Sequence, residues 1–168
     1  MGYTTDFIGE FKLNKKLDEK TQKFLELLAT TRRMKRDVSK LPESGYEKLG
    51  FDSWGVQGEF FAKDDGDCGQ GDHESIVEYN NPPTTQPDLW CQWIPTEDGL
   101  AIEWDGNEKF YNYVEWLDYI VSNVLKPRGY KLDGQVDWAG EQQGDVGIIM
   151  VTDNVIKILA GRTVYEEI

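Results

Sequence analysis

The fold class is decided by the stretch FYNYVEWLDYIVSNVL, residues 110–125. Its apolar side chains recur every three or four positions, which is the spacing of one face of an α-helix. The members of this apolar stripe are Phe110, Tyr113, Val114, Leu117, Ile120, Val121, Val124 and Leu125. Asp105 or Asn107 is a candidate N-cap, and Pro127 with Gly129 is expected to end the helix. We therefore predict one amphipathic helix that packs its apolar face on a sheet.

Three strands are predicted after this helix. Residues 130–138, 146–152 and 155–159 have the length and composition of strands. Asp153 and Asn154 indicate a tight two-residue turn between the last two of them. Consecutive strands joined by short turns pair antiparallel, so this part of the chain is expected to form a meander.

Two more strand regions are predicted before the helix. Residues 89–94 and 100–104 indicate a tryptophan-rich hairpin around the five-residue turn at 95–99. Residues 54–63 indicate another strand, bulged near Gly58. The hairpin again implies antiparallel pairing.

The N-terminal region predicts a strand followed by a helix. Apolar and polar residues alternate over residues 5–13, which is the period of a half-buried strand. Asp18 stands where an N-cap belongs, and the helical spacing of the apolar residues that follow ends near Thr31. The remaining segments are predicted to be a loop at residues 37–50, an exposed tip at 64–74 and an extended proline segment at 80–87.

This order of elements favours an α+β fold. Strands that pair through hairpins form a mostly antiparallel sheet, and two helices inserted between them cover one of its faces. No repeat or linker divides the chain, so residues 1–168 are predicted to form a single α+β domain.

The charge of the chain indicates what it binds. Thirty-one acidic against eighteen basic residues give a formal net charge of -13, which disfavours coating duplex DNA or an anionic membrane and favours a cationic partner. Residues 12–40 carry ten basic and four acidic residues, whereas residues 64–118 carry fourteen acidic residues and one basic residue. This asymmetry fits either two oppositely charged binding surfaces or simply solvated, solubilising faces. The chain shows neither a membrane-spanning apolar run nor a secretory signal, so a bacterial host cytoplasm is the expected location.

Catalytic and metal-binding motifs are absent from the sequence. His73 is the only histidine, and together with Cys68 and Cys91 it does not supply the ligand set of a structural zinc site. No nucleophile, phosphate-loop or dinucleotide motif occurs. We therefore expect neither a metal nor a cofactor, and leave open whether these three residues have a metal or redox role.

The candidate residues for partner binding fall into three groups. The acidic group is predicted on the hairpin turn and before the second helix, where Glu103, Asp105 and Glu108 could alternatively share acid and base roles or complement the helix dipole. Trp90 and Trp93 cannot both face one core, and Trp116 and Tyr119 flank or oppose the helical stripe. Such aromatic side chains either form an exposed protein-binding patch or lie under loop cover or a second layer. A basic cluster after the first helix either contacts RNA phosphates or pairs within the protein. The candidates are Glu97, Asp98, Glu103, Asp105 and Glu108; Trp93, Trp116 and Tyr119; and Arg32, Arg33 and Arg36.

An ordered set of motifs also resembles a family of small acidic proteins carried by bacteriophages and mobile elements. These motifs are YTTDF at residues 3–7, TRRM at 31–34, PPTTQP at 82–87, WCQW at 90–93, EWDG at 103–106, FYNY at 110–113, PRGY at 127–130 and VDW at 136–138. The resemblance implies an accessory protein that blocks a host defence by binding it, and it carries over no catalytic residue.

We therefore predict an inhibitor of a bacterial nucleic-acid-targeting defence system, of the anti-CRISPR type, that acts through an acidic surface on a cationic nucleic-acid channel. The alternative is a small-ligand or nucleotide-handling protein, with or without enzymatic activity, that uses Glu103, Asp105 and Trp93. A structural accessory protein with a protein partner is a third reading.

Overall fold

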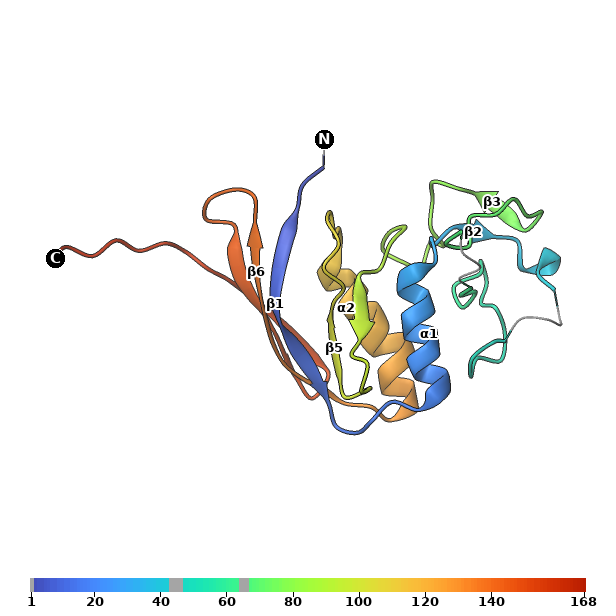
Figure 1. Cartoon of the computed structure of the whole chain (residues 1–168), viewed down its shortest axis with the longest axis horizontal. Helices are drawn as coiled ribbons and strands as arrows, with labels where there is room; N and C mark the ends of the chain where they lie inside the picture. The colour runs from blue at the N-terminus through green and yellow to red at the C-terminus, as the bar shows by residue number, and fades with distance from the viewer. Residues whose placement is uncertain (1, 43–46, 64–66) are drawn as a thin grey trace.

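The computed structural model describes residues 2–42, 47–63 and 67–168, and its main feature is a six-stranded antiparallel sheet in the order β4-β5-β1-β6-β7-β8. The strands are β1 Thr5–Leu13, β4 Trp93–Pro95, β5 Ala101–Trp104, β6 Leu132–Gly140, β7 Val146–Thr152 and β8 Val155–Ala160. Helices α1 (Glu19–Thr30) and α2 (Tyr113–Ile120) lie on one side of the sheet (Figure 1). The predicted α+β class is therefore confirmed.

Strand β1 shows how the two faces of the sheet differ. Phe7 and Phe11 are buried in the core, whereas Ile8 on the opposite face is 77% exposed. This alternation is the period of two that the sequence shows. Pairing with β6 runs the whole length of β1, and at Gly9 a Cβ would lie 2.7 Å from the carbonyl oxygen of Gln135. Only glycine fits this close approach, which occurs at a φ of +114°.

Helix α1 begins as the sequence predicts. The carboxylate of Asp18 accepts hydrogen bonds from the backbone N–H of Thr21 (2.9 Å), from the Thr21 hydroxyl (2.8 Å) and from the hydroxyl of Tyr130 (2.8 Å). Partial burial acts to raise the pKa of Asp18, but these hydrogen bonds hold it below its ordinary value. The helix ends at Thr30, one residue before its C-cap Thr31.

The predicted second helix is confirmed over residues 113–125, whereas residues 107–112 are not helical. The predicted N-caps Asp105 and Asn107 are wrong, because the Asp105 carboxylate instead accepts from the Asn107 N–H (2.8 Å) in a local turn. Helix α2 begins after Asn112, which has a φ of 55°. The helical path continues through a π-helical segment η2 (Val121–Leu125) and a 3-10 turn η3 (Lys126–Arg128), and Gly129 ends it at a φ of 78°, as expected.

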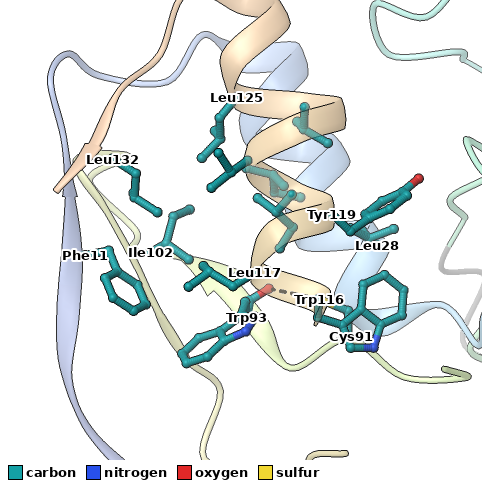
Figure 2. Packing of buried hydrophobic residues seen from close by; sticks show 14 of the residues in the cluster. Phe11, Leu28, Cys91, Trp93, Ile102, Trp116, Leu117, Tyr119, Leu125 and Leu132 are labelled. Carbon is teal, nitrogen blue, oxygen red and sulfur yellow. Dashed lines mark hydrogen bonds between the residues drawn. The ribbon is translucent and has the colours of Figure 1, made fainter. Parts of the chain in front are cut away.

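The core lies on both sides of α2. In Figure 2, Leu117 points toward Phe11 and Ile102 of the sheet, whereas Trp116 and Tyr119 point away from it. Sequence periodicity predicts a stripe facing a sheet. The structure buries more of the helix than this stripe and leaves a side with Glu115, Asp118 and Ser122 exposed, because an irregular layer formed by the described residues between Thr31 and Cys91 covers part of the other side.

The strand predicted at residues 54–63, in the irregular layer, is wrong. Residues 54–63 form turns rather than a strand, because Gly55 and Gly58 have φ values of 85° and 84° and reverse the chain direction. The Glu59 carboxylate accepts from the backbone N–H groups of Val56 (2.7 Å) and Gln57 (3.1 Å), which fixes the turn. A two-stranded sheet of β2 (Lys35–Arg36) and β3 (Ile76–Glu78) was not predicted, because both strands are too short to show a period.

The three segments predicted as loops differ in detail from the prediction. The loop predicted at residues 37–50 contains a short 3-10 helix, η1 (Val38–Lys40). Residues 43–46 of this loop lie outside the described part of the chain. Residues 64–66 of the predicted exposed tip also lie outside it. In the described remainder, residues 67–74, Asp67, Asp72 and Glu74 are exposed as predicted, whereas Gly69 is buried. Residues 80–87 form neither helix nor strand, as expected, but the segment is not extended throughout, because the Gln86 N–H donates to the Pro83 carbonyl (2.9 Å) and closes a turn.

Candidate protein-binding site

The aromatic candidates do not lie on the surface. Trp93 and Trp116 are 0% exposed, and Tyr119 is 6% exposed, so their assignment as partner contacts is wrong. The indole N–H of Trp93 donates to the carbonyl of Tyr113 (2.8 Å), and its ring packs edge-on against Phe7. The irregular layer buries Trp116 and Tyr119, a contact between segments that helical periodicity does not reveal.

Two of the three basic candidates are buried as well. Arg33 donates to Gln86 Oε1 (3.2 Å) and to the carbonyl of Glu59 (2.8 Å), and burial lowers its pKa to about 10. Arg36 donates to the Ser75 hydroxyl (2.9 Å) and to a backbone carbonyl. Neither side chain can contact RNA phosphates. Their geometry fits the alternative in which the basic cluster bonds within the protein.

Arg32 is the half-exposed member of the basic cluster. Its guanidinium donates to the carbonyl of Tyr79 (2.9 Å) and to Asn80 Oδ1 (3.2 Å). It also lies over the ring of Trp90, 5.9 Å from the ring centre. Arg32 therefore holds Trp90 from one side while part of that ring stays accessible.

The acidic candidates are separated into three places. Glu97 and Asp98 are exposed on the turn between β4 and β5, where hydrogen bonds from the Thr96 hydroxyl (2.6 Å) and the Leu100 N–H (3.0 Å) hold the pKa of Asp98 below its usual range. Glu103 lies on β5, directly opposite Glu10 of β1. Asp105 and Glu108 follow β5 at the other end of the hairpin.

Two adjoining hollows, of about 460 and 370 Å³, share Trp90 and Gln92 in their walls. We call this pair of hollows the Trp90 groove. Its polar lining includes Asp105 in one hollow, and Asp88 and Glu108 in the other, with Lys109 as a cation. The groove is thus a concave surface with an aromatic ring between carboxylates.

The side chains of the groove are held in place before any partner arrives. Gln92 accepts from the indole N–H of Trp104 (3.0 Å) and donates to the carbonyl of Glu108 (2.9 Å). Asp88 accepts from the side-chain amide of Asn112 (3.0 Å). Such fixed polar groups lose little conformational entropy when they bind a ligand.

Asp105 is the groove carboxylate whose charged form is disfavoured by burial. It is partly buried, and this burial raises its pKa against the hydrogen bonds from Asn107 that lower it. Among the described residues, no cation forms a salt bridge with it. A cation from a partner would supply the ion pair that Asp105 lacks within the described part of the chain.

The face of the sheet opposite the helices carries further acids. We call it the open sheet face, defined by Asp6, Ile8, Glu10, Glu103, Asp133 and Asp137, which the strand register places on one side. Like charges directly opposite one another, as at Glu10 and Glu103, destabilise a sheet. An ion pair from Lys12 to Glu10 (3.1 Å) offsets this repulsion in part.

The described residues add no candidate metal ligand or redox-active group to those that the sequence suggests. Within the described residues, no group of three or more potential ligands could hold a metal ion. His73 Nδ1 accepts from the backbone N–H of Ser75 (3.1 Å) and contacts its hydroxyl. Burial raises the pKa of the Cys91 thiol to about 12, whereas Cys68 is half-buried in the wall of the Trp90 groove. In the described part of the chain, no helix is both long and apolar enough to cross a membrane.

Sequence reasoning missed Trp90 as a groove residue. The alternation over residues 90–93 correctly indicates that one of the two tryptophans lies near the surface, but Trp93 was the candidate and Trp90 is the half-exposed one. Asp88 and Gln92 carry no sequence signal, because they reach the groove only through folding. Comparison of this chain with models of protein families, with curated proteins and with solved structures finds no match.

Proposed function

We propose that this protein is a phage-type accessory protein that binds and inhibits a bacterial nucleic-acid-targeting defence system, of the anti-CRISPR type, through its acidic surface. The observation that carries the proposal is the Trp90 groove, in which the partly buried carboxylate of Asp105, without a salt bridge among the described residues, lines the same hollow as an accessible indole ring. Nucleases guided by nucleic acids hold their substrate in positively charged channels. An acidic protein can occupy such a channel and exclude the nucleic acid.

The chemistry of the groove favours an arginine or lysine side chain as its central contact. A guanidinium stacks on an indole face and pairs with carboxylates in a fixed planar geometry, which suits a groove with Trp90 between Asp105 and Asp88. The open sheet face adds long-range attraction, and a net charge of -13 steers the encounter with a cationic partner.

The alternative function as a small-ligand or nucleotide-handling protein is not supported by a common site. Trp93 is buried in the core, Glu103 belongs to the open sheet face, and Asp105 lines the Trp90 groove. In the described part of the chain, these three side chains do not line a common hollow. We therefore keep the inhibitor as the proposal.

The test compares two triple variants with equal charge. The groove variant is Asp88→Asn with Asp105→Asn and Glu108→Gln. The control is Glu19→Gln with Glu26→Gln and Asp52→Asn, three exposed residues that do not line the groove. Each changes the net charge from -13 to -10 by removing three carboxylates. Purified RNA-guided nuclease effectors are assayed for target cleavage with each protein at two salt concentrations.

We expect the wild-type protein and the control to inhibit, and the groove variant to need at least about tenfold more protein, equivalent to about 1.4 kcal/mol. Inhibition should weaken as salt rises through about 0.1 M, where the screening length is about 10 Å. Full inhibition by the groove variant would overturn the acidic mechanism. Inactivation of excess effector by a trace of protein would instead indicate an enzyme.

A further inference from the structure

The two edges of the six-stranded sheet differ in a way that points to a second copy of this chain. Edge strand β4 has three residues, ends in Pro95 and contacts α1. Edge strand β8 has six residues, no proline, and Lys157 as its single charge. Natural proteins protect long edge strands with prolines, charges or covering segments, because free edges pair with other chains. β8 has little of this protection.

The backbone of β8 is ready to pair on its outer side. Gly161 donates its N–H to the carbonyl of Val146 on β7 (2.8 Å). Peptide groups of an antiparallel strand alternate in direction, so Ile156, Ile158 and Ala160 turn theirs away from β7. Side chains beside this free edge are apolar and exposed, with Ile158 at 44% and Leu159 at 48%.

Residues 161–168 continue β8 as an extended arm that leaves the body of the protein (Figure 1). All eight residues are exposed, and they include the apolar side chains of Val164 and Tyr165, the latter 83% exposed. At about 3.3 Å per residue, the arm spans about 26 Å, enough to cover the six residues of β8, about 20 Å. An exposed arm of this length and an open edge of matching length are self-complementary.

We infer that the C-terminal arm pairs with the β8 edge of a second copy, so that two sheets join into one antiparallel sheet across a two-fold axis at Gly161. This register places Gly161 opposite its own copy at a non-hydrogen-bonded position, where backbones approach most closely and a glycine offers no side chain. Ile158 then faces Val164 of the other copy. Lys157 faces Tyr165 and lies diagonal to Glu167, so charges of opposite sign meet on one side of the sheet.

The affinity of this dimer is expected to be modest. Residues 155–168 supply 14 residues a side, fewer than the roughly 20–30 of a standard interface. Each copy also carries a charge of -13, so added salt should strengthen self-association. The proposed binding of a cationic partner weakens with salt, which keeps the two interactions distinguishable.

The test is sedimentation velocity of the full chain from about 5 to about 500 µM, a range suited to a micromolar Kd. We expect a monomer–dimer equilibrium. Val164→Asp should weaken it by at least about tenfold, and it should not disturb the fold because the side chain is exposed on the arm. The matched control is Val56→Asp, the same substitution at a valine in the irregular layer that is 82% exposed. This control should leave the monomer–dimer equilibrium unchanged.

A charge exchange tests the register. Lys157→Glu and Glu167→Lys should each weaken the dimer, and the double variant should restore it, because the diagonal pair is then rebuilt with reversed signs. Circular dichroism serves as the control that each variant is folded. A protein that stays monomeric over the whole range, or a Val164→Asp variant that dimerises like the wild type, would overturn the inference. A double exchange that fails to restore dimerisation would overturn the register.

Discussion

Replacing Phe7 with alanine is the sharpest test of how the core is joined. The Phe7 ring packs edge-on against the rings of Tyr113 (4.9 Å between centroids), Trp93 (5.3 Å) and Trp104 (5.4 Å), so it connects β1 to the β4–β5 hairpin and to the start of α2. Truncating a buried Phe costs about 3–5 kcal/mol from lost burial and the cavity left behind. The loss of its edge-on contacts places this site at the upper end of that range.

The matched control is the next residue of the same strand. Ile8 is 77% exposed on the open sheet face, so Ile8→Ala should change stability by no more than about 0.5 kcal/mol. Urea unfolding followed by tryptophan fluorescence measures both variants, with an unchanged slope showing that the unfolded states are comparable. If Phe7→Ala cost less than about 2 kcal/mol, or if the two variants lost equal stability, the assignment of faces in β1 would be refuted.

Further predictions concern individual side chains. Asp18→Ala should cost about 1 kcal/mol at neutral pH; because the folded pKa of Asp18 is lowered, this difference from wild type should disappear as the pH falls through that pKa in urea titrations at a series of pH values. Asp105→Asn should raise the urea midpoint at neutral pH, since burial raises the Asp105 pKa and so disfavours its charged form in the fold; a lowered midpoint would contradict this. A thiol reagent should modify Cys68 in the native protein and reach Cys91 only after unfolding, because the Cys91 thiol is buried with a pKa of about 12. Leu117→Asp should cost on the order of 3–5 kcal/mol in the same unfolding assay, because it places an unpaired charge at a fully buried position.

The elements that sequence predicts well are those whose signal is local. Strand β1 has the predicted bounds, and β7 with its two-residue turn to β8 is reproduced, the turn residues Asp153 and Asn154 having φ values of 47° and 67°. The cap of α1 at Asp18 depends on a residue three positions away. Alternation, capping and turn chemistry all act within a few residues, so they are legible in the sequence.

The candidate site was predicted less well, because its members come from separate segments. Asp105 and Glu108 do line the groove, but Asp88 and Trp90 join them from the other side of the hairpin, and Glu97 lies elsewhere on the turn. The sequence shows an excess of carboxylates. Which of them share a concavity depends on how the chain after α1 packs.

The sequence by itself determined an antiparallel sheet with two helices, since periodicity and turns specify which face of each element seeks a core. Only the tertiary structure decided that a second, irregular layer covers α2. Arg33 bonds to Gln86, 53 residues later, and Gln86 donates to Tyr119, a further 33 residues on. These contacts bury an arginine and a tyrosine whose local patterns favour exposure. Burial is a property of everything that packs around a side chain, and residues with no periodic relation to it supply most of that surrounding.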